Sequence, residues 1–479
     1  MTKPNSLSIM WFRQDLRLSD NPGLSAACQS ANVLPIYILD DETAGQYRMG
    51  GASRWWLHHS LHALNASLGN ALNIYSGDAA TIIADLCQRF TVDSVYWNRC
   101  YEPHHIAQSK HIKTHLAALG ISANSINGSL LNEPWSVSKK DGTPYKIFTP
   151  YHREASKVDQ PITLLPAPNL TEKLTIDPDA MPLEALSLLP EIKWDSNFDA
   201  LWNPGEQGAL LALNRFLANG IHNYKDGRDR PALKSFSSLS PHLHFGDISA
   251  HQVINEMLRV EDDENSEHFK REIRWREFSY YLLYHFPGLP NQNLKVNFDK
   301  FPWENNPDSL KRWQKGLTGY PLVDAGMREL WQTGYMHNRV RMVTASFLIK
   351  NLLVDWRLGA SWFWDCLVDA DLASNSASWQ WVAGCGTDAS PYFRVFNPVT
   401  QGEKFDSKGE YTKRFLPELK DLPDKYLYRP WEAPPEVLRK ANITLGETYP
   451  HPIVQIKESR LRALDAYSLT RTIDKSLAP

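Results

Sequence analysis

The first 120 residues alternate between short apolar segments and longer helical ones, and this alternation constrains the fold more than any other feature. Strands joined by helices in this order form a doubly wound parallel sheet, so an α/β, Rossmann-like domain is expected. No Gly-x-Gly-x-x-Gly motif follows the first strand. The sheet is therefore expected to bind another ligand or none, rather than a dinucleotide at that turn. We predict strands at 8–12, 33–39, 72–75 and 94–97, and helices at 53–68, 79–90 and 104–119.

The pattern changes twice further along the chain. From about 133 to 203 prolines interrupt the periodicity, which predicts a long linker draped over the surface. After Pro204 the apolar spacing becomes helical and stays so to the end. We therefore expect an α/β domain at 1–132, an inter-domain linker at 133–203 and an all-α domain at 204–479. The clearest helices are predicted at 210–219, 251–258, 266–285, 310–316, 323–333, 337–355 and 361–366.

Composition narrows the class of protein. The chain has 479 residues, of which 42% are hydrophobic and 22% charged, as in an ordinary soluble protein of two or three domains. Five cysteines without a C-x-x-C pair argue against a zinc site and against a secreted disulfide framework. We expect no metal, no signal peptide, no membrane span and a cytoplasmic location. A net charge of −3 means that a polyanion must be met by a local basic patch.

An acidic and aromatic run at 369–381 stands out in the helical part. Nine of the 17 tryptophans fall between residues 275 and 381. Indoles at this density can form core, a stacking surface or an electron relay. Acid and amide groups beside them favour a polar, planar cofactor as the enclosed group. The run combines two carboxylates, one amide and two indoles: Asp369, Asp371, Asn375, Trp379 and Trp381.

Two predicted helices carry functional side chains on one face. Asn338, Arg341 and Met342 are spaced i, i+3 and i+4, which suits a flat ligand lying against the helix. The same spacing fits a half-buried helix whose Arg makes an ion pair. Glu272 and Trp275 share a face of another helix, where a carboxylate can hydrogen-bond an unstacked base while the indole stacks on it. A core Trp beside a surface Glu gives the same pattern.

A hydroxyl-rich stretch precedes a predicted helical segment. The loop at 224–231 is followed by the run Ser237-Ser-Leu-Ser-Pro241. Hydroxyls and backbone N–H groups at a helix N-terminus suit a phosphate, and ordinary N-capping accounts for the same residues.

Seven motifs, taken in order, resemble those of one family. They are Trp11-Phe-Arg-Gln-Asp-Leu-Arg17, Trp275-Arg-Glu-Phe278, Gly319-Tyr-Pro321, Met336-His-Asn-Arg-Val-Arg-Met342, Asp369-Ala-Asp-Leu-Ala-Ser-Asn375, Trp379-Gln-Trp381 and Phe396-Asn-Pro398. Together they are similar to the motifs of the photolyase/cryptochrome flavoproteins, from Leu7 to about Pro452. Within the family the chain looks most like a bacterial cyclobutane pyrimidine dimer (CPD) photolyase.

The resemblance implies FAD bound in a bent form by the helical domain, with Arg341 paired to Asp369. Asn375 is expected to face flavin N5 and to favour the reduced flavin. Phe236 departs from the family pattern, which usually has Thr, so one phosphate contact is missing or comes from a neighbouring serine (Ser235 or Ser237). The implied FAD contacts are Tyr224, Phe236, Ser237, Ser238, Leu239, Ser240, Asn338, Arg341, Asp369, Ala370, Asp371 and Asn375.

The resemblance also implies light-dependent DNA repair. In this family the excited, reduced, anionic flavin donates an electron to the dimer, the cyclobutane ring splits and the electron returns. The dimer must first leave the base stack. The implied catalytic residues are Glu272, Asn338, Met342 and a photoreduction chain of Trp379, Trp356 and Trp303. The implied DNA contacts are Glu272, Trp275, Arg276, Asn338, Arg339, Met342, Trp381, Arg394 and Lys404.

Two accessory features are expected by the same resemblance. An antenna chromophore, 5,10-methenyltetrahydrofolate, is expected beside residues 50–60, although His104 and His105 stand where some relatives carry an Asn-Glu pair for folate. Trp362 and Trp364 offer a second electron route. We expect a monomer that acts on UV-damaged DNA and needs no protein partner.

Four alternatives are weighed at this point. A purely structural DNA-binding module would leave Asn375 and the aspartates unexplained. A cryptochrome-type photoreceptor shares the FAD and the tryptophans, but about 27 residues after the resemblance are short for an effector tail. A (6-4) photolyase is expected to carry His where Met342 stands. A flavin oxidoreductase needs a site for a second substrate, and no motif indicates one.

Overall fold

The computed structural model describes residues 6–388 and 393–471, and the chain divides into two compact units. Each unit is assembled from segments that lie far apart in the sequence. The predicted domain boundaries at 132 and 203 stay a prediction. Unit 1 comprises Met1–His222, Ser237–Pro287 and Val368–Ala373, and unit 2 comprises Asn223–Phe236, Gly288–Leu367 and Ser374–Pro479.

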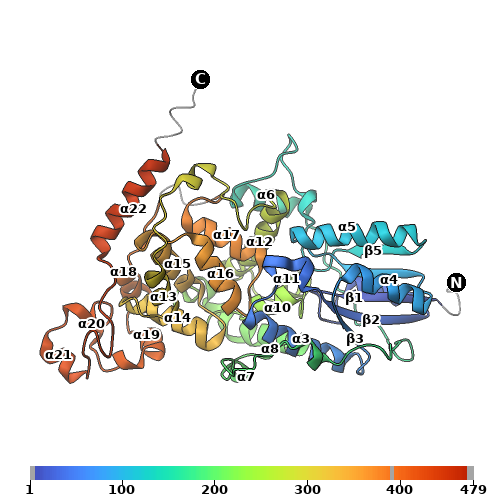
Figure 1. Cartoon of the computed structure of the whole chain (residues 1–479), viewed down its shortest axis with the longest axis horizontal. Coiled ribbons are helices and arrows are strands. Elements are labelled where there is room, and N and C mark those ends of the chain that lie inside the picture. Colours follow the sequence, from blue (N-terminus) through green and yellow to red (C-terminus); the bar gives the residue numbers. More distant parts are fainter. Residues whose placement is uncertain (1–5, 389–392, 472–479) are drawn as a thin grey trace. The chain divides into compact units, whose positions relative to one another are not determined.

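Unit 1 contains the predicted parallel sheet, whose strands run in the order β3-β2-β1-β4-β5 (Figure 1). Ile9 of the central strand β1 lies opposite Leu34 of β2 on one side and Val95 of β4 on the other. The chain winds outward from β1 to β3 and returns to add β4 and β5, which confirms the doubly wound topology. The strands are β1 (Leu7–Phe12), β2 (Asn32–Leu39), β3 (Asn73–Ser76), β4 (Ser94–Asn98) and β5 (Ser122–Ile126).

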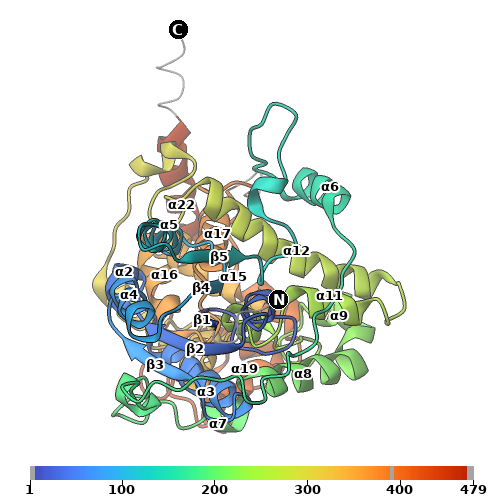
Figure 2. The ribbon, with the colours of Figure 1, turned by 90° about the vertical axis from the view of Figure 1, so that its right-hand side faces the viewer.

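The sheet is buried on both faces because alternate side chains of each strand meet different helices. Met10 and Phe12 pack with the tryptophans of α3, whereas Ile9 and Trp11 pack with α4 and α5. Figure 2 shows α3 on one side of the strands and α4 and α5 on the other. Strands buried on both faces are nearly continuous apolar runs, which is why four of the five could be predicted. The helices around the sheet are α1 (Pro22–Ala27), α2 (Asp41–Ala44), α3 (Gly51–Ser67), α4 (Ala79–Phe90) and α5 (Pro103–Ala118).

The segment at 133–203 is more structured than the expected linker. It contains the helix α6 (Phe148–Val158), which buries Phe148 and Tyr151. It also returns to the sheet, where the Met181 N–H donates to the Ile74 carbonyl oxygen at 3.0 Å. The prolines prevent long regular elements here, but they do not keep the segment off the core. Its shorter helices are η2 (Pro134–Ser136), η3 (Leu183–Leu186) and α7 (Phe198–Leu201).

The remaining helices of unit 1 include α12, the longest of them. It begins with a capping box, in which Asp263 accepts from the Ser266 N–H at 2.8 Å and the Ser266 hydroxyl oxygen accepts from the Asp263 N–H at 3.0 Å. The predicted helices at 251–258 and 266–285 correspond to α11 and α12. These helices are α8 (Glu206–Arg215), α10 (Ser240–Phe245), α11 (Ala250–Met257) and α12 (Glu264–His285).

Unit 2 is built from helices. The helix predicted over 337–355 is shorter, because α15 passes into a π-helical turn at Phe347–Asn351 and Leu353 then takes a left-handed φ of 52°. The helix α17 begins in unit 1 and continues into unit 2. The helices are α9 (Tyr224–Gly227), α13 (Pro307–Gln314), α14 (Pro321–Thr333), α15 (Asn338–Ser346), α16 (Trp356–Cys366), α17 (Leu372–Ala383), α18 (Pro398–Phe405), α19 (Glu410–Phe415), α20 (Asp424–Leu427), α21 (Pro435–Lys440) and α22 (Ile456–Arg471).

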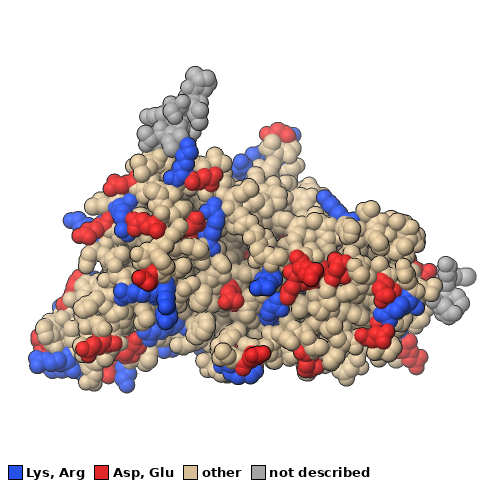
Figure 3. Space-filling model, in the orientation of Figure 1, with Lys and Arg blue, Asp and Glu red and all other residues tan. Residues whose placement is uncertain are grey.

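Surface charge is mixed on the face seen in Figure 3, where acidic and basic side chains are interspersed. A polyanion that binds this face must therefore be met by a small basic cluster. Within the described residues, no helix has both the length and the apolar character needed to cross a bilayer.

Candidate functional site

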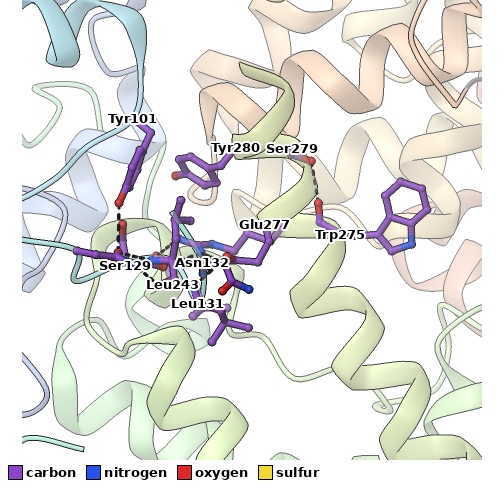
Figure 4. Close-up of polar contacts among 12 residues, drawn as sticks. Tyr101, Ser129, Leu131, Asn132, Leu243, Trp275, Glu277, Ser279 and Tyr280 are labelled. Carbon is purple, nitrogen blue, oxygen red and sulfur yellow. Dashed lines mark hydrogen bonds and ion pairs between the residues drawn. The ribbon is translucent and has the colours of Figure 1, made fainter. Parts of the chain in front are cut away.

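One side of helix α12 makes structural contacts within unit 1 (Figure 4). The buried carboxylate of Glu277 accepts hydrogen bonds from the backbone N–H groups of Leu131 (2.9 Å) and Asn132 (3.3 Å). Burial raises the pKa of Glu277 to about 7, although Arg276 and Arg274 act in the opposite direction. This side of α12 therefore holds the chain that enters the 133–203 segment.

Arg276, a predicted DNA contact, takes part in the same structural side. Its guanidinium donates to the carbonyl oxygens of Ser129 (3.0 Å) and Leu243 (3.2 Å) and lies 4.9 Å from the ring centre of Tyr280. These bonds tie α12 to α10 and to the loop after β5. The contact of Arg276 with DNA stays a prediction.

Trp275 lies on the opposite side of α12 and is half-buried. Figure 4 shows its indole pointing away from Glu277. One indole face is covered by Phe148, with ring centres 3.7 Å and planes 7° apart. The other face is the one that can stack on a base. Glu272 lies one turn earlier on the same side of the helix, as the sequence predicted, and is half-buried.

Two predicted carboxylates lie against α10 and α12 within unit 1. Asp369 accepts a hydrogen bond from the Ser240 hydroxyl at 2.6 Å. Asp371 accepts from the Tyr280 hydroxyl and lies 3.1 Å from Nδ1 of His244. Burial alone raises the pKa of Asp371, but the hydrogen bond from His244 and its other polar neighbours hold that pKa well below its usual range. Asp371 is therefore an ionised acceptor at neutral pH.

Two residues that contact Asp371, His244 and Tyr280, were not among the predicted site residues. His244 had a weak signal, because it follows the hydroxyl-rich run in the segment Ser240-Pro-His-Leu-His244. Tyr280 had none, since a tyrosine within a helix looks like ordinary core. Between the two carboxylates, Ala370 is buried, with 2% of its surface exposed.

The predicted phosphate segment forms a tight turn before α10. Ser238 has a φ of 58°, a left-handed conformation that few residues other than glycine adopt. The Ser237 hydroxyl oxygen accepts from the Leu239 N–H at 3.3 Å, and Leu239 is buried. Strained backbone of this kind is concentrated at functional sites.

Two predicted FAD contacts of this region belong to unit 2. Tyr224 is buried in α9, with the Arg228 guanidinium 5.6 Å from its ring centre. Phe236 packs against Tyr335 at 5.7 Å and against His337 at 5.9 Å. This aromatic packing explains why an apolar residue is tolerated at 236, where a hydroxyl was expected.

Helix α15 carries three predicted contacts along one side. Asn338 is exposed, and Arg341 and Met342 are half-buried. Arg341 donates from Nε to the Met336 carbonyl oxygen at 2.6 Å, and its guanidinium lies 5.0 Å from the ring centre of Tyr335. The ion pair between Arg341 and Asp369 stays a prediction.

Three predicted phosphate-binding cations lie in unit 2. Arg339 pairs with Asp229 at 2.8 Å. Its guanidinium lies 4.5 Å from the ring centre of Phe405, and the Lys404 ammonium lies 5.0 Å from the same ring. The structure therefore brings Arg339 and Lys404 together around one aromatic side chain. Arg394 is exposed.

Two of the tryptophans predicted to form a relay meet at helix α16. Trp356 is the first residue of α16 and is fully buried, and its indole N–H donates to Asn293 at 2.9 Å. Trp379 is 2% exposed, and its indole lies against Gly359, one turn after Trp356. The ring of Phe363 lies 5.0 Å from that of Trp379.

Trp303 lies beside the start of α16. The N–H of the next residue, Glu304, donates to the Leu353 carbonyl oxygen at 2.8 Å, just before the helix. Asn305 accepts from the Asp355 N–H at 2.8 Å. Trp303 is half-buried, so the three indoles include two in the interior and one toward the surface.

The other predicted residues of this region surround α16 and α17. Asn375, one turn before Trp379, donates from Nδ2 to the Ala360 carbonyl oxygen at 3.1 Å. Trp381 is half-buried. Trp362 stacks on Trp331, with ring centres 6.0 Å and planes 4° apart, and Trp331 is 50% exposed. Trp364 is half-buried.

The predicted antenna region lies beside the sheet in unit 1. The rings of His104 and His105 are 4.2 Å apart, and Tyr47 stacks on His104 at 6.1 Å. Burial lowers the pKa of both histidines, so they are neutral at pH 7. In the predicted antenna segment 50–60, Arg54 of α3 forms an ion pair with Asp41 at 2.5 Å.

Comparison with known proteins gives the following matches. Residues 8–169 match a family model described as DNA photolyase, and residues 269–469 match one described as FAD binding domain of DNA photolyase. The chain is 48% identical over 471 residues to a deoxyribodipyrimidine photo-lyase of Agrobacterium fabrum, which covers 97% of this chain and 98% of the relative. It is 38% identical over 488 residues to cryptochrome-2 of Arabidopsis thaliana, which covers 98% of this chain and 80% of the relative. A crystal structure of a bacterial class III photolyase from Agrobacterium tumefaciens matches with a TM-score of 0.94 at 47% identity, covering 98% of this chain and 99% of that one.

Proposed function

The chain belongs to the DNA photolyase family, and from this premise we propose that it is a carbon-carbon lyase that repairs cyclobutane pyrimidine dimers in DNA with light as the energy source. The observation that carries the proposal is its 48% identity over nearly the full length of a deoxyribodipyrimidine photo-lyase. The identity to a plant cryptochrome is lower, and it spans less of that relative.

FAD fits the residues that the chain supplies. The match to the FAD-binding model begins at residue 269 and includes Asp369, Asp371 and Asn375. Asp371 is held ionised by its donors, so it can accept from a ribose hydroxyl or from a ring N–H. The turn at 237–240 offers hydroxyls and backbone N–H groups to a phosphate. When bound, reduced and excited by light, FAD supplies the electron that splits the dimer.

Asn375 is proposed to favour the reduced, anionic form of the flavin. Its amide has both a donor and an acceptor end, and its Nδ2 already donates to Ala360. The acceptor oxygen is therefore left for a protonated flavin nitrogen. An Asp at this position would place a second charge beside an anion, which Asn avoids.

Trp275 and Glu272 are proposed to recognise the extruded dimer. Because Phe148 covers one face of the indole, a base can stack only on the other. Glu272, one turn away, can accept a hydrogen bond from a pyrimidine N–H. Asn338, Met342 and Trp381 are proposed to complete the contacts with the dimer.

Arg339 and Lys404 are proposed to bind the DNA backbone, with Arg394 as a further contact. Cations that lie over one aromatic ring keep their charge and gain a fixed position. Contacts of this kind position DNA without reading its sequence.

Trp379, Trp356 and Trp303 are proposed as a relay that reduces oxidised flavin, and Trp362 and Trp364 as a second route. Support comes from the convergence of the first three around α16, where two are buried and Trp303 reaches toward the surface.

The remaining features are proposed on the resemblance. We propose 5,10-methenyltetrahydrofolate as the antenna, near His104 and His105, and a cytoplasmic monomer. The neutral His104 ring, stacked on Tyr47, offers an uncharged aromatic surface for a pterin.

The test is a paired repair assay on oligonucleotides with one lesion each, illuminated with chemically reduced enzyme. We expect repair of the cyclobutane dimer and none of the (6-4) product, because reversing a (6-4) adduct needs an acid and Met342 cannot supply one. Repair of neither substrate under reducing conditions would favour a cryptochrome-type photoreceptor. Repair of the (6-4) substrate would overturn the lesion assignment.

A further inference from the structure

Arg339, which is proposed to contact a DNA phosphate, forms an ion pair with the carboxylate of Asp229. Its Nη2 lies 2.8 Å from Oδ2 of Asp229, and both side chains keep part of their surface exposed, 18% and 35% respectively. Its buried Nε has no hydrogen-bond partner among the described residues. A guanidinium is a fork of donors that suits a phosphate or a carboxylate equally well. Asp229 therefore occupies donors that a DNA phosphate would use.

Other charged groups lie near this ion pair. Burial lowers the pKa of His337 to about 4; Asp229 opposes this shift, and Arg341, Arg339 and Arg228 add to it. The Glu329 carboxyl also reaches this place, where it accepts from the His337 N–H at 3.1 Å, and burial raises its pKa to about 7. Arg339 is therefore one of several cations at the start of α15, and Asp229 is the carboxylate that pairs with it.

The start of a helix is an unfavourable place for these cations. The N-terminus of α15 carries a partial positive charge, and its first turn contains no acidic residue. His337 caps the helix in its neutral form, with its ring nitrogen accepting from the Arg339 N–H at 3.3 Å. A helix start with added arginines is suited to an anion from outside. Asp229 is the carboxylate that pairs with Arg339 there.

Asp229 lies in a hydrogen-bonded turn that follows α9. The Arg228 N–H donates to the Tyr224 carbonyl oxygen at 2.9 Å, and the Arg230 N–H donates to the Gly227 carbonyl oxygen at 3.0 Å. The carboxylate therefore comes from a different segment than Arg339. The Arg339 guanidinium also lies 4.5 Å from the ring centre of Phe405, a contact that does not involve Asp229.

We propose that Asp229 is an internal competitor of the DNA backbone for Arg339. In the free protein its carboxylate holds the guanidinium ready, and on binding a phosphate of the damaged strand replaces it. The exchange lowers the affinity for every duplex, damaged or not, because backbone contacts carry no sequence information. The proposal rests on the proposed function, in which Arg339 contacts DNA.

The proposal predicts a gain of affinity from the loss of an ion pair. Asp229→Asn keeps the shape of the side chain and removes its charge. Because partly exposed ion pairs are weak, we expect Asp229→Asn to bind both damaged and undamaged duplex only about two- to five-fold more tightly than the natural protein. The gain should shrink as salt is raised, since it is electrostatic.

The matched control is Asp424→Asn. Asp424 also lies in unit 2 and pairs with a cation, Lys413, at 2.8 Å, so the substitution makes the same change in net charge. A general effect of charge would move both variants alike. The proposal expects the gain at Asp229 and little change at Asp424.

The decisive experiment is a double-mutant cycle on the FAD-loaded protein, measured by fluorescence anisotropy with a labelled duplex that carries one dimer. Asp229→Asn should tighten binding in the natural background and do nothing in an Arg339→Gln background. Weaker or unchanged binding by Asp229→Asn, a gain equal to that of the Asp424 control, or a gain that persists without Arg339 would overturn the proposal. A separate comparison tests the proposed function itself. It fails if the natural protein neither binds the damaged duplex more tightly than the undamaged one nor repairs it.

Discussion

Gly359→Ala is expected to disturb Trp379 without altering any residue proposed to contact DNA. A Cβ atom at 359 would lie 2.2 Å from Cη2 and 2.6 Å from Cζ3 of the Trp379 indole, and 2.6 Å from Cδ2 of Leu348. The indole has little room to retreat. Its ring centre is 5.0 Å from that of Phe363 and 6.4 Å from that of Trp313.

Two opposing effects determine how much Gly359→Ala changes the free energy of unfolding. Alanine is favoured over glycine within a helix by about 1 kcal/mol. Overpacking a core costs about 1–3 kcal/mol. Because the overlaps fall on a buried aromatic ring, we expect overpacking to win and the free energy of unfolding to fall by about 1 kcal/mol. The displaced indole should also slow photoreduction of oxidised flavin, while repair by already reduced enzyme stays close to normal.

The destabilisation by Gly359→Ala should disappear when the side chain at position 379 is made smaller. Trp379→Phe removes the two indole atoms that the new methyl group would meet. In that background only the end of the flexible Leu348 side chain remains in the way. Gly359→Ala is then expected to be neutral, or to stabilise by up to about 1 kcal/mol through helix propensity.

The assay is urea unfolding of the natural protein, the two single variants and the double variant, each with its FAD content checked by absorbance. A stabilising effect of Gly359→Ala in the natural background would refute the reasoning. The same destabilisation in both backgrounds would do so as well, because the clash would then not involve the indole.

Further predictions follow from the same structure. Trp379→Phe should block photoreduction but leave repair by reduced enzyme nearly intact, and equal loss of both in paired rate measurements would contradict the relay. Glu272→Ala and Trp381→Ala should each cost about 1–3 kcal/mol in dimer binding without loss of FAD, as measured by titration with damaged duplex. Heat release and chromatography should yield about one FAD per chain, and a colourless protein that cannot be reconstituted would refute this. Burial raises the pKa of Glu329 from 4.5 to about 7, so the folded state keeps a proton that the unfolded state loses. Stability should therefore fall as pH rises from about 4.5 to about 7, and Glu329→Gln should flatten this dependence in urea midpoints.

The sheet could be predicted from sequence where burial on both faces made its strands continuously apolar. Ile9 and Val95 belong to such runs, and their strands lie within a residue or two of the predicted bounds. The strand β5 could not be predicted, because most of its residues (Ser122–Ile126) are polar and all are at least partly exposed at the edge of the sheet. Helical periodicity also could not reveal the π-helical turn at 347–351, since the apolar pattern continues through it.

The candidate site could be predicted only where the residue types are unusual for the sequence around them. Asp369, Asp371 and Asn375 stood out because acids and amides are unusual in an aromatic run. Tyr280 could not be found, because its role depends on a hydroxyl that meets Asp371 from a distant part of the chain. Phe148 was hidden for the same reason, since only the folded chain places it on Trp275.

The return of the 133–203 segment to the sheet determines where this chain can be cut. Val33 exchanges hydrogen bonds with Lys173 and Thr175, each at 2.8 Å, and Ile74 accepts from Met181. A fragment that stopped at 132 would leave these groups of β2 and β3 open along one margin of the sheet. Open margins of this kind recruit strands from other molecules and lead to aggregation. A fragment that keeps the sheet paired must therefore include residues 133–203, although the prolines of that segment suggested a surface linker.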